Sequence, residues 1–326
     1  MSHIFQRTLS WCAAGLILAT QAPTVVEYPL PRPRAFPHDP AVGHDGIVWY
    51  TDQANSYIGR LDPATSKVTD YATPTPASGP HGIVVAPPPD GGVWYTANFQ
   101  GRIGRLDPAT GTIKEYVLPR AARDPHTPLY HQGKIWFTAQ AANLYGWLDP
   151  VTGETKIFPV GTPDARPYGL VAGPDGAIWV ALFGTNKVGR INPADGALRE
   201  FPLPDGGARP RRLIVDAQGM VWYSDYARGK LGRLDPATGQ VREFASPGGS
   251  GSAPYGIALG TDGRVWYDES SKDEIVAFDP RTERTQTYPI PTHGSVVRNM
   301  AVDSARGRLW LALSGIQRLG RIDLRP

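Results

Sequence analysis

The sequence predicts an all-β fold, a seven-bladed β-propeller, from three observations. A tryptophan recurs at intervals of 42 to 45 residues, the differences between successive members of Trp49, Trp94, Trp136, Trp179, Trp222, Trp266 and Trp310. A turn of the form G-R-L-D-P-A-T-G, or a close relative, follows each tryptophan segment. A short segment that ends in Tyr or Phe comes next. Repeats of roughly 40–45 residues built from strand-like pieces are typical of propeller blades with four strands.

Each repeat divides into four strand-like segments. The innermost segment begins with P-H-G-I-V-V at 80–85 or P-Y-G-L-V-A at 167–172, and a Gly-Pro-Asp-Gly turn at 173–176 follows the second of these. The second segment is V-W-Y-T or I-W-V-A, whose apolar character suits a strand packed on both faces. The third is I-G-R-L-D, and the fourth is I-K-E-Y at 113–116 or L-R-E-F at 198–201.

The two ends of the chain predict how the ring closes. The first outer-strand aromatic residue, Tyr28, precedes every tryptophan segment, and the chain stops after the third segment of the last repeat, near Asp323. We therefore expect residues 25–28 to supply the missing fourth strand of the last blade, which removes the open sheet edge. This gives a single propeller domain over residues 23–326.

The first 22 residues do not belong to the repeat. His3 and Arg7 precede an apolar stretch at 9–19, and the small-residue sequence A-T-Q-A follows it. We interpret 1–22 as a secretory signal peptide, too short for a membrane span; an ordinary helical or disordered N-terminus is the alternative. Removal of this segment also removes Cys12, the single cysteine. We expect a periplasmic or secreted protein that is not attached to a membrane after cleavage.

Composition narrows the classes of partner. The formal charge of +3 is small for 326 residues, and no run of Lys or Arg stands out, so nucleic acid is not expected as a partner. The 37 glycines and 33 prolines fit a fold with many tight turns. We expect a monomer that binds a small molecule or cyclic peptide in its central channel.

Polar residues vary at one position of the repeat, where the innermost segment begins. That segment starts, and the antiparallel second segment ends, on the same rim of the ring, so residues at both positions should converge near the channel. The starts of the innermost segments carry His38, His81, His126, Tyr168, Arg211, Tyr255 and Arg298. The ends of the second segments carry Asp52, Ala97, Ala139, Leu182, Asp225, Glu269 and Leu313, with Gln53, Asn98 and Gln140 just after three of them.

A simpler interpretation of this pattern remains open. X-Pro-His-Gly is a favourable turn at the entry of a strand, and a histidine there can serve only that turn. The seven tryptophans are interpreted as blade packing, and the Asp of D-P-A-T-G as a turn cap. His44, His131 and His293 fall in turns or loops, and we interpret them as solvated.

At these residues the chain resembles the virginiamycin B lyase family, the streptogramin lyases. The resemblance covers all seven repeats through the W-[FY]-T, I-G-R-[IL], E-[FY]-x-[IL]-P and P-H-G-I segments. It implies a propeller enzyme that linearises a cyclic depsipeptide antibiotic by β-elimination at the ester, with a divalent cation, usually Mg²⁺. A role in antibiotic resistance follows from that activity.

The family's catalytic pattern joins a P-H-[AG]-I entry in one blade to an acidic-P-H entry in the next. Here Gly79-Pro80-His81-Gly82-Ile83 resembles the first element, and Asp124-Pro125-His126 the second, with Asp in place of Glu. The third position, a glutamate in the family, falls on Gln140, and the matched pair lies in blades two and three rather than near the C-terminus. The resemblance implies Asp124, His81 and Gln140 around Mg²⁺, the hard ion that prefers oxygen ligands.

As a hypothesis, neutral His126 accepts the proton of a carbon acid, since the usual pKa of an imidazole is near ~6.5. Mg²⁺ near Asp124 and His81 polarises the carbonyl. The remaining predicted substrate contacts are His38, Asp52, Tyr168, Arg211, Tyr255, Glu269 and Arg298, where the arginines hold a substrate carboxylate and the tyrosines form aromatic walls.

Two other classes of function remain open. One is a non-catalytic exported propeller that binds a ligand or protein on the same rim, which Gln140 in place of a carboxylate favours. The other is a metal-dependent lactonase-type hydrolase. For that class His38, His81 and His126 form a three-imidazole set, which suits Zn²⁺ better than Mg²⁺.

Overall fold

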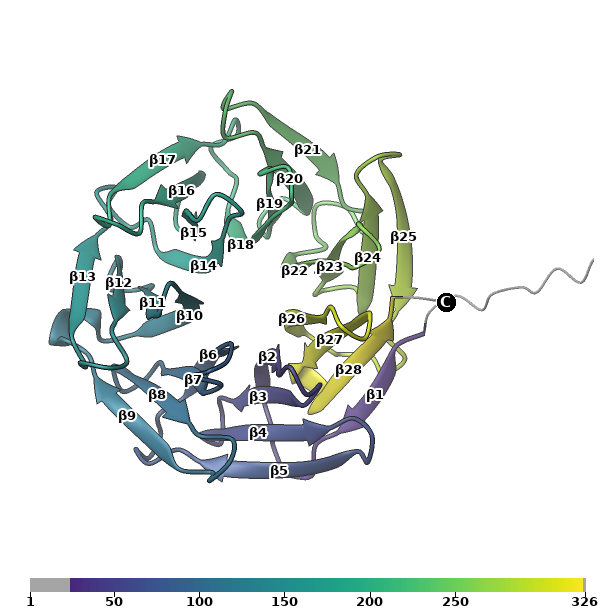
Figure 1. Cartoon of the computed structure of the whole chain (residues 1–326). Coiled ribbons are helices and arrows are strands. Elements are labelled where there is room, and N and C mark those ends of the chain that lie inside the picture. Colours follow the sequence, from purple (N-terminus) through teal and green to yellow (C-terminus); the bar gives the residue numbers. More distant parts are fainter. Residues whose placement is uncertain (1–23, 325–326) are drawn as a thin grey trace, which may run out of the picture.

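The computed structural model describes residues 24–324 as seven four-stranded antiparallel sheets arranged around a central axis (Figure 1). The strands of each sheet follow one another in sequence from the axis outward, except in the sheet that holds both ends of the chain. This confirms the predicted all-β, seven-bladed propeller. The predicted signal peptide at 1–22, with Cys12, lies outside the described residues.

The strands fall into four concentric sets. The innermost strands are β2 (Pro37–Val42), β6 (Pro80–Val85), β10 (Pro125–His131), β14 (Pro167–Ala172), β18 (Pro210–Val215), β22 (Pro254–Leu259) and β26 (Val297–Asp303). The second strands are β3 (Val48–Asp52), β7 (Val93–Ala97), β11 (Lys134–Ala139), β15 (Ile178–Leu182), β19 (Val221–Asp225), β23 (Val265–Glu269) and β27 (Arg308–Leu313).

The third strands are β4 (Tyr57–Asp62), β8 (Arg102–Leu106), β12 (Leu144–Leu148), β16 (Lys187–Ile191), β20 (Lys230–Leu234), β24 (Glu274–Asp279) and β28 (Arg318–Asp323). The outer strands are β5 (Lys67–Ala72), β9 (Ile113–Val117), β13 (Thr155–Pro159), β17 (Leu198–Pro202), β21 (Val241–Ala245), β25 (Arg284–Pro289) and β1 (Val26–Pro29). Two three-residue 3₁₀ turns complete the described elements, η1 (Arg120–Ala122) and η2 (Ser314–Ile316). No described segment is a helix long and apolar enough to cross a membrane.

The ends of the chain close the ring as the sequence predicts. Strand β1 pairs antiparallel with β28, so that Tyr28 lies opposite Leu319, and the two strands lie side by side in Figure 1. Glu27 forms an ion pair with Arg318 of β28 and accepts hydrogen bonds from Thr292 of the preceding blade. The last blade therefore has no exposed third-strand edge.

The tryptophans of the second strands form the packing between blades. All seven are buried. Trp94 of blade 2 packs in one cluster with Ile135 and Phe137 of blade 3. Trp136 of blade 3 does the same with Ile178 of blade 4. This confirms the interpretation of the tryptophans as scaffold, since each one joins neighbouring sheets.

In three of the blades, the ring of a neighbouring tyrosine explains why the I-G-R-L segment has a glycine. In blade 2 the ring of Tyr95 lies across Gly104, and a Cβ atom there would overlap the ring carbon that carries the hydroxyl. The Tyr95 hydroxyl donates to Glu115 of β9 at 2.9 Å, which ties the second strand to the outer strand. Gly59 and Gly232 lie in the same way under Tyr50 and Tyr223.

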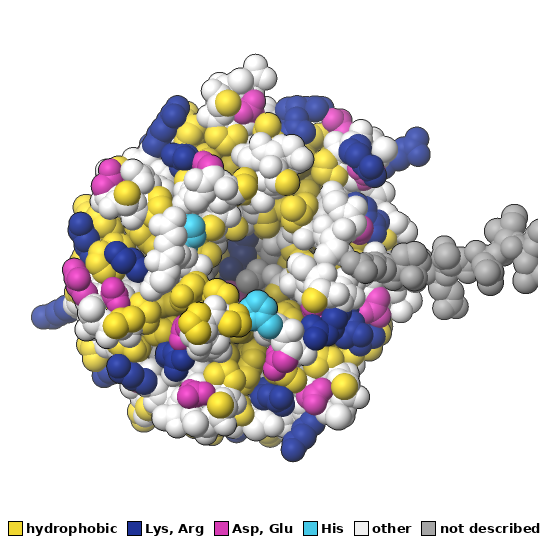
Figure 2. Space-filling view, viewed as in Figure 1, with side chains coloured by type: hydrophobic (Ala, Val, Ile, Leu, Met, Phe, Trp, Pro, Cys, Tyr) yellow, Lys and Arg dark blue, Asp and Glu magenta, His cyan; other side chains and the backbone are white. Residues whose placement is uncertain are grey.

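The D-P-A-T-G turns are capped as predicted. Oδ1 of Asp107 accepts the Ala109 amide at 2.9 Å, and Asp235 accepts the Ala237 amide at the same distance. On the face seen in Figure 2, charged side chains of both signs are interspersed around the rim, and Lys or Arg atoms lie within the central opening.

Candidate functional site

A β-bulge at the start of every innermost strand aims side chains at the channel. In blade 1, Pro37 pairs with Asp52 but Pro40 pairs with Tyr50, so strand β2 carries one more residue than β3 over this stretch. The same irregularity recurs in all seven blades. Because a bulge re-aims the residues it contains, the residue after each entry position can also turn toward the axis.

The seven bulges bring the seven predicted entry residues together. One hollow of about 270 Å³ at this mouth of the channel has on its wall His38, His81, His126, Tyr168, Arg211, Tyr255 and Arg298, together with Phe36, Gln53, Asn98 and Gln140. We call this the entry hollow. Residues far apart in the sequence thus share one cavity, as the circular arrangement of the blades predicts.

Three imidazoles lie in a row on one side of the entry hollow, each ring tilted against the next. The ring centroids of His38 and His81 are 3.7 Å apart, and those of His81 and His126 are 3.6 Å apart. Burial and the neighbouring His126 lower the pKa of His81 well below its usual value. Burial and the Arg212 guanidinium do the same to the pKa of His126. These two imidazoles are therefore neutral at pH 7 and are able to accept protons.

A buried ion pair crosses the channel, and neither partner was predicted from the sequence as a site residue. Nη2 of Arg212 in β18 lies 2.7 Å from Oδ1 and 3.0 Å from Oδ2 of Asp39 in β2. Oδ1 of Asp39 is also 2.9 Å from Nδ1 of His38. Although burial acts in the opposite direction, the Arg212 guanidinium lowers the pKa of Asp39, which is therefore ionised. The signal available in the sequence was position: each residue directly follows an entry residue.

Aromatic rings hold the two arginines of the entry hollow. The guanidinium carbon of Arg211 lies 3.9 Å from the ring centre of Tyr255 and 4.9 Å from that of Tyr168. The rings of Phe183 and Tyr226 are within 4.7 Å and 4.4 Å of it. Arg298 lies between Phe36 and Tyr255, at 5.6 Å from each ring centre. The Tyr168 and Tyr255 hydroxyls are hydrogen-bonded to each other.

Hydroxyl groups on the second strands fix the backbone of the entry residues. Thr51 donates to the carbonyl of His81 at 2.7 Å, Thr96 donates to that of His126 at 2.7 Å, and Thr138 donates to that of Tyr168 at 2.8 Å. Each bond joins one blade to the next. The positions of these three entry residues, and of Tyr255, whose carbonyl accepts from Ser224 at 2.8 Å, therefore depend on a small polar residue of the preceding blade, a role that the sequence analysis missed.

The predicted carboxylates do not reach the entry hollow. Asp52 accepts the Phe36 amide at 3.0 Å. Glu269 accepts the Gly248 amide at 2.8 Å. Asp124 accepts the amides of Ala141 and Ala142. Each carboxylate accepts backbone amides of a rim turn, and none of the three lines the entry hollow. The assignment of Asp52 and Glu269 to ligand contacts is corrected accordingly.

These contacts also alter the predicted metal site. Gln140 and His81 line the entry hollow, but Asp124 does not, and both its oxygens are engaged by backbone amides. Within residues 24–324, His38, Asp39 and His81 form the one cluster whose ligand atoms lie within 4.8 Å of one another. Its carboxylate already pairs with Arg212. The donor set therefore does not fit Mg²⁺, which prefers several free oxygen ligands.

The three other histidines lie outside the entry hollow. His44 is exposed, as predicted, and the His293 side chain is 96% exposed. His131 differs from the prediction, because it is half-buried and its Nε2 lies 2.9 Å from the carbonyl of Gly176 in the next blade. It is a contact between blades and not a solvated residue.

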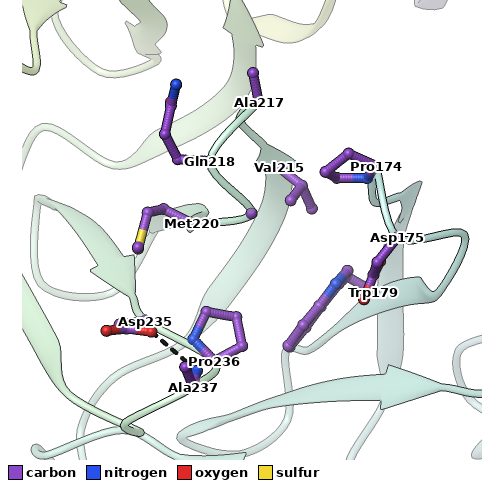
Figure 3. Close-up of a pocket in the computed structure, with 11 residues that line it drawn as sticks. Pro174, Asp175, Trp179, Val215, Ala217, Gln218, Met220, Asp235, Pro236 and Ala237 are labelled. Atoms are coloured by element: carbon purple, nitrogen blue, oxygen red, sulfur yellow. Dashed lines mark hydrogen bonds between the residues drawn. The ribbon is translucent and has the colours of Figure 1, made fainter.

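Other hollows follow from the repeat or lie farther from the axis. A groove between blades 4 and 5, lined by Trp179, Met220 and Pro236 among others, lies on the opposite rim (Figure 3). Similar grooves lie between blades 5 and 6 and between blades 7 and 1. A further hollow, beside Phe99 and Val117, lies on the same rim of the propeller as the entry hollow. Each of these is lined by residues of at most two neighbouring blades, whereas the entry hollow is lined by residues of seven.

Comparisons with known proteins agree with this architecture. The model of the virginiamycin B lyase family matches residues 16–151 and 153–325. A streptogramin B lyase structure is 25% identical over 93% of this chain and 98% of its own, with a TM-score of 0.85. Selenomethionine-substituted virginiamycin B lyase from Staphylococcus aureus is also 25% identical, over 93% of this chain and 100% of its own, with a TM-score of 0.86. A catalytically inactive histidine-to-alanine variant of that lyase with quinupristin is 24% identical, with the same coverage and TM-score. No curated protein sequence matches the chain.

Proposed function

The chain belongs to the virginiamycin B lyase family, and on that premise we propose that it is a carbon–oxygen lyase that opens a cyclic ester or depsipeptide. The proposed reaction is β-elimination, and the proposed active site is the entry hollow. The observation that carries the proposal is the convergence of seven bulged strand starts, which places neutral imidazoles and two guanidinium groups in one hollow.

The proposed reaction requires a base and a positively charged group that binds the leaving carboxylate. A base removes the proton from the carbon next to the carbonyl, that electron pair forms a carbon–carbon double bond, and the ester oxygen leaves the β-carbon as a carboxylate. His126 is the proposed base. Its Nδ1 lies 3.2 Å from the Thr127 hydroxyl oxygen, and in the tautomer in which Nδ1 donates to that oxygen, Nε2 is free to accept the proton. His81, whose ring lies against that of His126, is the second candidate.

The two arginines of the hollow are suited to bind the leaving carboxylate. Arg211 and Arg298 lie in the wall of the same hollow as the histidines, and guanidinium groups form strong charge-assisted hydrogen bonds with carboxylates. Tyr168 and Tyr255 provide aromatic walls between them. Because the donor set does not fit Mg²⁺, no step of the proposal passes through that ion.

Product mass tests the reaction. Wild type, His126→Gln and His81→Gln are incubated with quinupristin, and the products are weighed by mass spectrometry. Elimination opens the ring without a change in mass, whereas a lactonase-type hydrolysis adds one water. We expect unchanged mass and a rate at least ~100-fold lower for His126→Gln, the usual range for loss of a general base. A product heavier by one water, or equal rates in all three proteins, contradicts the proposal.

A second candidate function is non-catalytic ligand binding in the same hollow. It is favoured by Gln140, which stands where the family pattern has a carboxylate, and by the engagement of Asp124 with backbone amides. Retained affinity for quinupristin without any product supports this candidate and excludes the lyase. Export to the periplasm or medium, which rests on the predicted signal peptide, and a monomeric state remain proposals for either function.

A further inference from the structure

We infer that the entry hollow is a carboxylate-binding site and not a divalent-cation site, so that it binds carboxylates as free ligands and not only as a group that a reaction releases. The inference rests on the proposed function only in placing the ligand in this hollow. It names the class of ligand, a carboxylate with an apolar or aromatic neighbour, which the family match does not provide.

The permanently charged side chains on the wall of the entry hollow are all positive. Among residues 24–324, the wall contains two arginines and three histidines, and it contains no aspartate or glutamate. The histidines are uncharged at neutral pH because burial lowers the pKa of each. The other polar side chains are the amides of Gln53, Asn98 and Gln140 and the tyrosine hydroxyls. The net charge of the wall is therefore positive.

The two arginines have no acidic partner in the described structure. Arg211 makes one hydrogen bond, to the Tyr168 hydroxyl at 3.4 Å, and its Nε atom is buried without a partner. The Nε atom of Arg298 is likewise buried and unpartnered. The surrounding rings stabilise the guanidinium groups through cation–π contacts, but they do not neutralise them.

Three carboxylates that adjoin the entry positions or end the second strands already have partners. Asp39 pairs with Arg212. Asp225 accepts the Arg209 amide at 3.0 Å and pairs with Arg228. Glu269 accepts the Gly248 amide. No ion pair among residues 24–324 involves Arg211 or Arg298, which leaves both free to pair with an acidic group of a ligand.

A carboxylate suits this position better than a metal ion. Guanidinium donors and a planar carboxylate have matching geometry, and the Tyr255 ring, which contacts both arginines, offers an apolar face beside the acid group. A divalent cation in the same hollow would be repelled by two guanidinium groups. It would also compete with Arg212 for the single nearby carboxylate.

Calorimetric titration with benzoate, on the full chain at low ionic strength, tests the inference. Acetate, inorganic phosphate, MgCl₂ and ZnCl₂ are titrated in parallel. The variants are Arg211→Gln and Arg298→Gln. The control is Arg199→Gln, which removes an exposed arginine that lies over Phe201 on the outer strand β17. A benzoate soak of wild-type crystals locates the ligand independently of any variant.

We expect benzoate to bind more tightly than acetate or phosphate and its affinity to fall with added salt. Each of Arg211→Gln and Arg298→Gln should weaken binding by about 10- to 100-fold, the range for a hydrogen bond to a charged group, and Arg199→Gln should leave it unchanged. Tighter binding of phosphate, Mg²⁺ or Zn²⁺ than of benzoate overturns the inference. So does benzoate density outside the hollow, or benzoate affinity that neither arginine variant reduces.

The outcome is separable from that of the proposed reaction. Benzoate contains no ester and its binding requires no turnover. Benzoate binding without ring opening of quinupristin contradicts the lyase and leaves the carboxylate site standing. Ring opening by a protein that does not bind benzoate contradicts the carboxylate site alone.

Discussion

Arg212 and Asp39, 173 residues apart in the sequence, form a buried ion pair that joins blade 5 to blade 1 across the channel. The side chains of both residues are less than a tenth exposed. Within the pair, the Arg212 guanidinium keeps the carboxylate of Asp39, which lies beside His38 and His81, ionised. It also stabilises the bulges of β2 and β18, from which His38 and Arg211 reach the entry hollow.

Removal of one partner of this pair should destabilise the protein strongly. Asp39→Asn leaves a buried guanidinium without its counter-charge, and losses of this kind are about 3–5 kcal/mol. Arg212→Met leaves the carboxylate unpaired and should cost a similar free energy of unfolding. The double variant should be more stable than the sum of the two losses predicts, because neither charge is then left alone. Denaturant unfolding of the four proteins measures the coupling, and strict additivity would argue against the pair.

Loss of the Thr96 hydroxyl should disturb the entry hollow, although Thr96 does not line it. Thr96 accepts the Gly82 amide at 3.0 Å and donates to the His126 carbonyl at 2.7 Å. Thr96→Val removes both bonds within nearly the same volume, so we expect a loss of about 1–3 kcal/mol in stability and weaker activity or ligand binding. The control is Thr110→Val, in an exposed turn. Equal effects of the two changes would show that the hydroxyl of Thr96 positions nothing.

Much of this architecture was predictable from the sequence, because it repeats. Strand periodicity predicted the blades, and the unmatched Tyr28 segment predicted the closure. The position of the entry residues predicted seven of the eleven residues that line the entry hollow. The directions of the carboxylates were not predictable. Asp52 and Asp124 lie one or two residues from Gln53 and His126, which line the hollow, and Glu269 ends its second strand as Asp52 does, but backbone amides of the rim turns bind all three.

The Asp39–Arg212 pair escaped prediction for a different reason. In a regular strand the residue after His38 points away from the axis, because side chains alternate. The bulge in each innermost strand breaks that alternation. The sequence of a single repeat does not predict which bulged residues contact each other across the ring. Gln140 was placed correctly in the hollow, but its expected partner Asp124 was not.

Stability should depend on pH through Asp268. Burial raises the pKa of Asp268 from 3.8 to about 7. Since the folded pKa lies above the unfolded one, this contribution to stability is complete below pH ~4 and is lost as pH rises through about 7. Relative to Asp268→Asn, wild type should lose roughly 3–4 kcal/mol over that range, at about 1.4 kcal/mol per pKa unit. Denaturant unfolding of both proteins at several pH values measures the difference. A difference that is constant with pH, or that grows in favour of wild type, contradicts this account.

The histidines act in the opposite direction over part of the same range. Their pKa values are lowered in the folded protein, so the unfolded chain takes up protons first and stability falls as pH drops through ~6.5. This is why Asp268 must be assessed as a difference between two proteins and not from the wild-type curve. In the same way, His126→Gln should reduce the acid sensitivity of the fold.

Closure of the ring should depend on Tyr28. Its ring is buried, lies 5.3 Å from that of Trp310, and its hydroxyl accepts from Arg321 at 2.7 Å. We expect Tyr28→Ala to destabilise by about 3–5 kcal/mol, as for other large-to-small changes in a core. Val26→Ala on the same strand is the control, because Val26 is 39% exposed. A similar melting temperature for both variants would mean that β1 does not hold the ring closed.

The central claim is that ligands of this protein bind where the seven bulged strand starts meet. A crystal structure of the His126→Gln variant soaked with quinupristin tests it most directly. We predict density in the entry hollow, in contact with His81 on one side and with Arg211 or Arg298 on the other. Density in the groove between blades 4 and 5 on the opposite rim, or beside Phe99 and Val117 with the entry hollow empty, would contradict the claim.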